Sequence, residues 1–351
     1  MPPAALVEIH YFAIAVCGGL ATFFWYPRVA SLAHPIQLLD AATRQTVWSE
    51  SYDRSFDLAS MLAIQDDIAR EVAIAVAQPY GAIYEREIET ASAKPKTMEG
   101  YVCVLRTYEY WRTLAPADHL VVRDCLERTI ASDPTYAAAW QAITYIYLDE
   151  YRYNFNLRPG DRDPRERAAE AAQRSVSLNP TDALSYQSLY AAYYYRGDMD
   201  GFRRAGAEAL RLNPNNPDII ADYGAKLAVA GGWEEGLSLI RRAMGLNPAH
   251  PGWYYTTFVL DAYRRGAYEE ALANTERMDM PEHYRVWVYF AMIYGQMGRT
   301  EDARAALARL AALSPDFAAH ARSDMAKWGY APDLIEACVD GLKKAGLAVA
   351  D

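Results

Sequence analysis

The sequence predicts a mainly α-helical fold, a right-handed solenoid of helical hairpins with a small α/β remnant at its amino-terminal end. Prolines recur 34 residues apart (214 − 180 = 34; 248 − 214 = 34), at Pro180, Pro214 and Pro248. Glycines recur with nearly the same period at another phase, at Gly197, Gly231, Gly266 and Gly298. Two phased periods of this kind indicate one helical hairpin copied in tandem. An apolar content of 52% is enough to give such a chain a packed core.

Residues 1–35 contain an apolar run from Tyr11 to Tyr26. A membrane-spanning helix needs about 20 residues, with tolerance down to about 17, and this run is slightly shorter. No Lys or Arg precedes the run, which disfavours a secretory signal peptide. Two interpretations stay open for residues 11–26. They form either an inner-membrane anchor, with Glu8 and Arg28 leaving the rest of the chain cytoplasmic, or an apolar leader that is partly buried or replaced by gene truncation.

Residues 36–96 have a different pattern, which predicts two short strands at 36–40 and 46–52 around a polar turn. An amphipathic helix is expected over about 57–77, and Pro79 should end it. The region resembles the closing part of a TolB-like α/β domain in three stretches, Gln37-Leu38-Leu39-Asp40-Ala41-Ala42-Thr43, Trp48-Ser49-Glu50-Ser51-Tyr52-Asp53-Arg54 and Ile64-Gln65-Asp66-Asp67-Ile68.

The hairpins follow as a degenerate copy at 97–134 and a regular array at 135–315. Three copies end in the same tripeptide, at Leu178-Asn179-Pro180, Leu212-Asn213-Pro214 and Leu246-Asn247-Pro248. Bulky groups in the first helices and small groups in the second helices recur at spacings of three, four and seven, as in Trp140-Ile143-Thr144-Tyr147, Tyr186-Leu189-Tyr190-Tyr193 and Ala168-Ala172. This pattern resembles the tetratricopeptide repeat, whose known fold is an α-solenoid.

The array departs from its period in two places. Pro134 and Pro180 are separated by more than one period (180 − 134 = 46), and the excess of twelve falls in 151–161, which predicts a loop inserted between the two helices of one repeat. The fourth repeat ends irregularly at Met280-Pro281. Residues 316–351 should form a capping helix near 332–345 and a tail.

The ending Asp340-Gly341-Leu342-Lys343-Lys344-Ala345-Gly346-Leu347 is similar to the tail of bacterial multidomain proteins. In those proteins a TolB-like domain and a tetratricopeptide array follow a class III adenylate cyclase or a winged-helix DNA-binding domain. The resemblance implies an alternative function for this chain, as the regulatory half of a nucleotide cyclase or transcription regulator that is separated from its output domain.

Composition and motifs exclude several functions. The 45 acidic and 35 basic side chains give a net charge of −10, which disfavours nucleic acid as a partner. No phosphate-binding glycine loop is present, and the six histidines are dispersed, so we expect no metal and no small-molecule cofactor. The pairs Glu234-Glu235 and Glu269-Glu270 precede second helices, where acids complement the helix dipole. We therefore do not expect an enzyme.

The four cysteines, Cys17, Cys103, Cys125 and Cys338, lie far apart and form no CxxC motif. This spacing predicts free or buried thiols in a reducing compartment.

What remains is a binding surface for a protein or peptide. First helices of such an array line a concave groove, and the helical phase turns one set of residues toward it. Aromatic rings with a few amides suit an extended or helical peptide. We expect the groove to include Gln141, Tyr145, Gln187, Tyr194, Trp253, Thr256, Tyr263 and Arg285. A second basic candidate is the inserted loop with Arg152, Arg158, Arg162, Arg165 and Arg167, although interleaved acids favour a solvated loop there.

Overall fold

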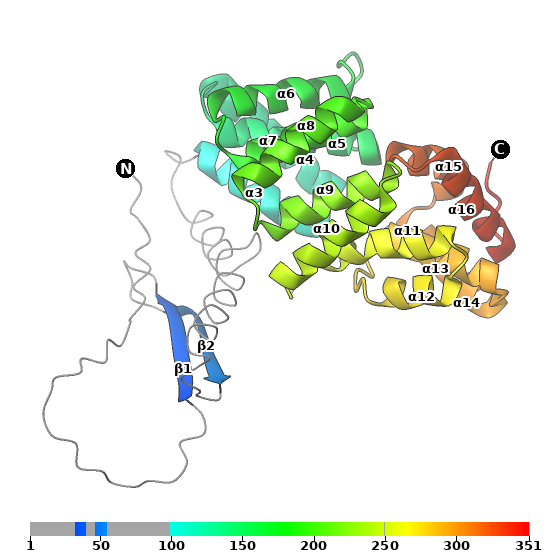
Figure 1. Cartoon of the computed structure of the whole chain (residues 1–351). Coiled ribbons are helices and arrows are strands. Elements are labelled where there is room, and N and C mark those ends of the chain that lie inside the picture. Colours follow the sequence, from blue (N-terminus) through cyan, green and yellow to red (C-terminus); the bar gives the residue numbers. More distant parts are fainter. Residues whose placement is uncertain (1–31, 40–45, 55–98, 249, 351) are drawn as a thin grey trace, which may run out of the picture. The chain divides into compact units, whose positions relative to one another are not determined.

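The computed structural model describes residues 32–39, 46–54, 99–248 and 250–350 (Figure 1). The chain divides into two units, residues 1–98 and 99–351, and each is described by itself. The apolar run 11–26 and the helix expected over 57–77 lie outside the described residues. Among the described residues, no helix is both long enough and apolar enough to cross a membrane.

The described part of the first unit is a β-hairpin. Strands β1 (Leu32–Leu39) and β2 (Thr46–Arg54) pair antiparallel, with Leu32 opposite Arg54 and Leu38 opposite Trp48. The register shifts between Leu38 and Leu39. The two strands expected around a polar turn are therefore present.

The second unit is entirely helical over its described residues, as the sequence predicted (Figure 1). Its helices run in pairs along the chain: α3 (Glu99–Thr113) and α4 (Pro116–Ser132), α5 (Ala137–Tyr153) and α6 (Pro164–Leu178), α7 (Ala183–Arg196) and α8 (Met199–Leu212), α9 (Pro217–Val229) and α10 (Trp233–Leu246), α11 (Thr256–Arg264) and α12 (Tyr268–Glu276), α13 (Tyr284–Met297) and α14 (Thr300–Leu313), α15 (Phe317–Lys327) and α16 (Pro332–Ala345). A 3₁₀ turn, η2 (Gly252–Tyr255), precedes α11.

The two phased periods of the sequence correspond to the two ends of each hairpin. Helices α6, α8 and α10 end at the leucine of a Leu-Asn-Pro tripeptide, and the asparagine is the C-cap residue. Proline then prevents the helix from continuing. The four periodic glycines stand in the turns within hairpins and have positive φ angles of 80°, 103°, 73° and 68°, which a residue without Cβ adopts at no steric cost.

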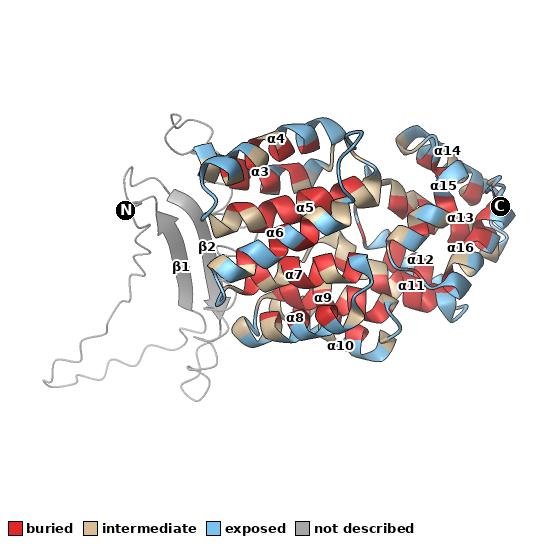
Figure 2. Ribbon diagram, turned by 90° about the horizontal axis from the view of Figure 1, so that it is seen from above, coloured by how far each residue is buried: buried red, intermediate tan, exposed pale blue. Residues whose placement is uncertain are grey.

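Buried residues form an inner stripe along the stacked helices (Figure 2). One apolar core runs from α3 to α9, a small one joins α9, α10 and η2, and a third runs from α11 to the end of the described chain. We refer to residues 99–246 as the amino-terminal half and to residues 252–350 as the carboxy-terminal half. The division between them falls at the irregular entry to α11.

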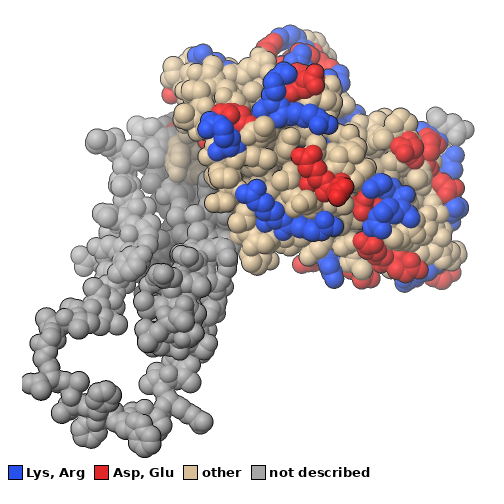
Figure 3. Space-filling model, viewed as in Figure 1, with Lys and Arg blue, Asp and Glu red and all other residues tan. Residues whose placement is uncertain are grey.

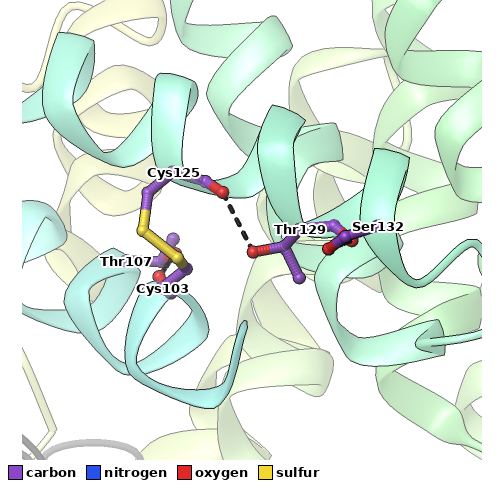
Figure 4. The surroundings of a disulfide bond; sticks show 5 residues. All are labelled: Cys103, Thr107, Cys125, Thr129 and Ser132. Atoms are coloured by element: carbon purple, nitrogen blue, oxygen red, sulfur yellow. Dashed lines mark hydrogen bonds between the residues drawn. A yellow bond between two sulfur atoms is a disulfide. The ribbon is translucent and has the colours of Figure 1, made fainter. Parts of the chain in front are cut away.

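A disulfide joins α3 to α4 in the first hairpin (Figure 4). Cys103 and Cys125 have Cα atoms 5.6 Å apart and are 0% and 4% exposed. The expectation of free or buried thiols is wrong for this pair, because the antiparallel hairpin brings the two cysteines together from 22 residues apart. Cys338 is a free, buried thiol, and burial raises its pKa to about 12. A buried disulfide favours an oxidising compartment over the reducing one that we expected.

The inserted loop begins later than expected. Helix α5 continues through Tyr153, and the chain then turns at Asn154 and Asn156, whose φ angles are 57° and 48°. Asparagine tolerates this left-handed conformation better than most residues. The last helix, α16, has the range expected for the capping helix, but α15 precedes it and was not expected.

Candidate functional site

The eight residues predicted to face a groove lie on the first helices of the hairpins or just before them. Four of the eight predicted groove residues are partly exposed: Tyr145 on α5, Gln187 on α7, Trp253 on η2 and Thr256 at the start of α11. The Tyr145 ring packs edge-to-face on Trp111, with ring centroids 5.5 Å apart. These positions form an aromatic and amide surface that spans three hairpins.

The other four predicted groove residues are buried. Gln141 and Arg285 are each 7% exposed, Tyr194 is 8% exposed and Tyr263 is 2% exposed. Three of these four bond to the last two helices or to the link between them. The sequence analysis assigned residues 316–351 only a capping role, whereas part of this segment lies against the predicted groove.

The contacts are specific hydrogen bonds. The Tyr194 hydroxyl on α7 donates to the carbonyl oxygen of Trp328 at 3.1 Å. The Tyr263 hydroxyl on α11 donates to the carbonyl oxygen of Ala337 on α16 at 2.9 Å and accepts from Gln296 at 3.2 Å. Phenolic hydroxyls therefore join the inner face of the array to the backbone of the carboxy-terminal helices.

We call residues 324–330 the Trp328 segment. Its indole contacts two guanidinium groups, because Arg152 and Arg285 lie 5.2 Å and 4.5 Å from a Trp328 ring centroid. The Tyr153 ring also meets the indole edge-to-face at 5.7 Å. Cation–π contacts of this kind are strongest where water is excluded. The segment thus joins the end of α5 to α13, although it lies far from α5 in the sequence.

Arg285 is the centre of the polar contacts around this segment. It forms an ion pair with Asp324 at 2.9 Å and donates to the Tyr330 hydroxyl at 2.7 Å. The other carboxylate oxygen of Asp324 accepts from the Tyr284 hydroxyl at 2.7 Å. Burial, together with nearby Arg285 and Arg152, lowers the pKa of His283 to about 4, so this imidazole is neutral at pH 7.

A cavity of about 620 Å³ adjoins the Trp328 segment. One side of it comes from the hairpin turns of the array, and the other comes from the α15–α16 link and the start of α16. Its walls are mostly apolar, with one arginine and one aspartate: Tyr194, Gly197, Met199, Val229, Ala230, Gly231, Trp233, Arg264, Gly329, Ala331, Asp333, Leu334 and Ala337. The Arg264 guanidinium stacks on Trp233 at 4.5 Å.

Helix α9 contributes two acidic groups to the inner face of the array. Asp218 accepts a hydrogen bond from the Tyr254 hydroxyl at 2.8 Å, and burial raises its pKa to about 6. Asp222 forms an ion pair with Lys226, one turn further along α9. The Lys226 ammonium also lies 5.8 Å from the Tyr195 ring centroid.

Some buried polar atoms of this region have no hydrogen-bond partner within the described part of the chain. They include the Tyr145 hydroxyl, one Asp222 oxygen, Arg152 Nε and Trp328 Nε1. A buried polar atom left unpaired costs about 1–3 kcal/mol.

The inserted loop is not a free basic surface, because each of its arginines has an acidic partner. Arg158 pairs with Asp124 at 2.7 Å and with Glu127 at 2.9 Å. The others pair within the same region: Arg152 with Asp149, Arg162 with Glu170, Arg165 with Asp163, and Arg167 with Glu150 and Asp161. Acidic and basic side chains also lie next to one another on the face shown in Figure 3.

Trp328, Asp324 and Tyr330 belong to this region although no sequence pattern predicted them there, and Arg152 lies on α5 and not in the predicted loop. One signal was present in the sequence. Trp328-Gly329-Tyr330 puts two large rings beside a glycine just after a helical stretch, where a turn directs them inward. Within the described residues, no group of three or more His, Cys, Asp or Glu side chains is placed to hold a metal ion.

Comparison with known proteins supports the repeat fold. Residues 262–327 match the tetratricopeptide repeat model. No curated protein sequence matches the chain. Among solved structures, the APC/C hetero-tetramer Cut9-Hcn1 is 14% identical, with a TM-score of 0.53 over 75% of this chain and 47% of that one.

Two further solved structures are similar. The human IFIT1 dimer with PPP-AAAA is 15% identical, with a TM-score of 0.50 over 70% of this chain and 60% of that one. PilF of Pseudomonas aeruginosa is 12% identical, with a TM-score of 0.43 over 62% of this chain and 92% of that one. At these identities the likeness concerns the fold, which is a tetratricopeptide-like solenoid.

Proposed function

We propose that this protein is a non-catalytic interaction scaffold that binds a peptide or a protein on the inner face of its helical array. Tetratricopeptide folds commonly mediate protein–protein interactions, and the described residues have such a fold. The fold alone does not determine function, so the proposal rests on the site.

One observation carries the proposal. Tyr145, Gln187, Trp253 and Thr256 are partly exposed, and they lie on or just before the first helices of three hairpins, at α5, α7 and η2–α11. Rings provide contact area at a small entropic cost, and a partly exposed amide such as that of Gln187 can pair with the backbone of a ligand. An extended peptide supplies both kinds of contact.

Selection from a displayed library of random peptides against the full chain tests this proposal. Selected peptides should bind the chain and lose about tenfold or more in affinity on Trp253→Ala or Gln187→Ala, measured by fluorescence anisotropy. Tyr194→Ala is a poor test, because Tyr194 is buried and packs on Phe202 with ring centroids 5.5 Å apart.

A matched control is available on an outer helix. Arg211 on α8 is exposed and pairs with Glu208, so Arg211→Ala should leave peptide affinity unchanged. Equal affinities for the chain and both inner-face variants, or no selected peptide at all, would count against the scaffold.

A second candidate function is the regulatory half of a nucleotide cyclase or winged-helix regulator. The β1–β2 hairpin lies where the resemblance to a TolB-like domain expects two strands, and this supports the candidate. Sequencing the genomic DNA upstream of the Met1 codon tests it. Cyclase or winged-helix coding sequence there would favour this candidate, and an unrelated gene would oppose it.

Cellular location is part of the same proposal. An anchor at residues 11–26 would place the chain on the inner membrane, whereas the Cys103–Cys125 disulfide supports an oxidising surrounding over the cytoplasm. Fractionation of the full chain beside one that lacks residues 1–30 tests the anchor. Equal solubility of the two chains would oppose it.

A further inference from the structure

The Trp328 segment is seated on the array as a ligand would be. It comes from the far end of the chain and contacts side chains of α5, α7 and α13, which belong to three different hairpins. Lys327, next to the indole, also donates to the Asn154 side chain at 2.6 Å, just beyond α5. The segment therefore displays the chemistry that this part of the inner face accepts.

Three features define that chemistry. An acid, Asp324, meets Arg285 and Tyr284; an indole, four residues later, meets two guanidinium groups; and the carbonyl of the same residue accepts from Tyr194. Positions four apart share one face of a helix, and α15 ends at Lys327, so the acid and the indole project together from a helix end.

The intramolecular fit is incomplete. Trp328 Nε1 and Arg152 Nε are both buried at the contact, and neither has a hydrogen-bond partner among the described residues. The cavity of about 620 Å³ extends from the segment along the turns of the array, and its apolar wall includes Met199 and Val229. An occupant that accepts a hydrogen bond from Arg152 Nε and fills the cavity would form more favourable contacts than the segment does.

We propose that Arg152, Tyr194 and Arg285 form a recognition site for a partner helix end that carries an acidic residue and, four positions later, an aromatic residue. The chain's own Trp328 segment occupies this site, and the partner binds by displacing it. This inference rests on the proposed scaffold function and specifies its partner. Arg285, whose ion-pair partner is the Asp324 carboxylate of the segment, provides the charge complementarity to the acid of a partner.

Displacement has a clear energetic consequence. The apparent dissociation constant of a competitor equals its intrinsic value divided by the fraction of chains with an open site. A substitution that releases the segment should therefore tighten binding of a competitor without altering the site. Two such substitutions exist, one at the indole and one at the turn that follows it.

Trp328→Ala removes the ring that occupies the site. Gly329→Ala acts differently: Gly329 has a φ angle of 80°, and a Cβ there would lie 2.1 Å from the Tyr194 hydroxyl oxygen. An alanine is strained in that backbone conformation, which destabilises the seated segment, and its Cβ also collides with the end of the Tyr194 side chain. Because the two variants open the site by different means, misfolding of one leaves the other available.

The experiment uses a fluorescently labelled synthetic peptide with the sequence of residues 320–332, added to the full chain. Its affinity, measured by anisotropy, should rise at least about tenfold on Trp328→Ala and on Gly329→Ala relative to the unaltered chain. Replacing the tryptophan or the single aspartate of the peptide, Asp324, by alanine should reverse the gain. Adding Arg285→Met to the Trp328→Ala chain should do the same.

Trp287→Ala is the matched control for loss of a tryptophan. Trp287 is also partly exposed and lies on α13, but its indole donates to the Pro281 carbonyl at 2.8 Å, away from the Trp328 segment. It should leave peptide affinity unchanged. Circular dichroism and thermal melting establish that each variant is folded.

Other results would overturn the inference. Equal peptide affinity for the unaltered chain and for the Trp328→Ala and Gly329→Ala chains would show that the segment does not occupy a binding site. A concentration-dependent dimer of the Gly329→Ala chain would assign the site to a second copy. If library-selected peptides bind through Trp253 and Gln187 but do not compete with the 320–332 peptide, this inference fails and the scaffold function stands.

Discussion

The two halves of the array follow the same repeat rule with different results. In the amino-terminal half, α7 to α10 each have 13 or 14 residues, and a Leu-Asn-Pro tripeptide ends α6, α8 and α10. In the carboxy-terminal half, α11 and α12 have nine residues each, and η2 replaces the first turn of the hairpin. The first half continues the stack, whereas the second half folds back onto it.

The halves also differ in what stabilises them. The amino-terminal half has a covalent bond between α3 and α4 and a buried ion pair between Arg123 and Glu150 at 3.1 Å. In the carboxy-terminal half, α16 packs closely against α13 through glycines, since a Cβ at Gly295 would lie 2.1 Å from the Gly341 carbonyl oxygen. The sequence period thus determines where the helices of each hairpin begin and end. Contacts between distant hairpins determine how the later helices pack on the earlier ones.

The largest expected difference between the two halves is their response to reduction of the Cys103–Cys125 disulfide. Its loop of about 22 residues predicts a loss of about 3 kcal/mol in unfolding free energy on reduction. Hydrogen exchange measured by mass spectrometry, with and without reductant, should show faster exchange in α3 and α4 and little change in α13 to α16. A Cys103→Ala/Cys125→Ala chain should be insensitive to reductant, and equal acceleration in both halves would contradict the comparison.

Gly295→Ala should loosen the carboxy-terminal half. Its Cβ would lie 2.1 Å from the Gly341 carbonyl oxygen, so α16 must move away from α13 at a cost of about 2 kcal/mol. Gly245→Ala in α10 is the matched control, because no atom lies within 4 Å of its Cβ, and it should stabilise the chain by about 0.5 kcal/mol. Chemical denaturation of both variants measures this, and the same sign for both would refute the packing argument.

Asp218→Asn should change how the amino-terminal half responds to pH. The folded pKa of about 6 lies above the ordinary 3.8, so the stability from the neutral acid is complete below pH 4 and is lost as pH rises through 6. Since Asp218 keeps part of its surface exposed, solvent limits the effect to about 1–2 kcal/mol. The variant should be more stable than the unaltered chain at pH 7 and equal to it at pH 4.

His283 in the carboxy-terminal half should show the opposite dependence. Its folded pKa of about 4 lies below the ordinary 6.5, so its stability is complete above pH 6.5 and is lost as pH falls toward 4. Denaturation of the Asp218→Asn chain from pH 4 to pH 7 should therefore show stability rising with pH. If the stability of this variant falls from pH 4 to pH 7, the pKa directions assigned to His283 and to Asp218 are both contradicted.

Tyr263→Phe should have the smallest effect of the set, about 1 kcal/mol, because it removes one hydroxyl bonded to the Ala337 carbonyl. Tyr190→Phe is its counterpart in the amino-terminal half, where the hydroxyl donates to the Ile219 carbonyl at 3.2 Å. Hydrogen exchange should accelerate in α16 for the first variant and in α9 for the second. Acceleration in the opposite half would contradict the assignment.

The hairpins could be predicted from the sequence because their determinants are local. Proline after asparagine ends a helix, and glycine with positive φ turns the chain, whatever the rest of the molecule does. The burial of Tyr194 and Arg285 could not be predicted in this way. Helical phase places both on the inner face, but the residues that cover them come from α15 and the link after it, far away in the sequence.

The disulfide could be predicted from the sequence only in part. Cys103 and Cys125 stand at nearly equal distances along the sequence from the turn at Leu114 and Ala115, one before it and one after it. In an antiparallel pair of helices, residues at nearly equal distances from the connecting turn lie opposite one another. The pairing was therefore available once the degenerate hairpin had been recognised, but not from the spacing of cysteines alone.

The contact between Trp328 and the end of α5 also has a mechanical consequence. A stack whose units touch only their neighbours stretches and twists like a coil spring, and its ends fray one unit at a time. Here the bond between the Tyr194 hydroxyl and the Trp328 carbonyl and the two guanidinium contacts tie one coil to a later one. These contacts should resist extension until they break. Pulling the two ends of the second unit apart should therefore produce one abrupt release before any gradual lengthening.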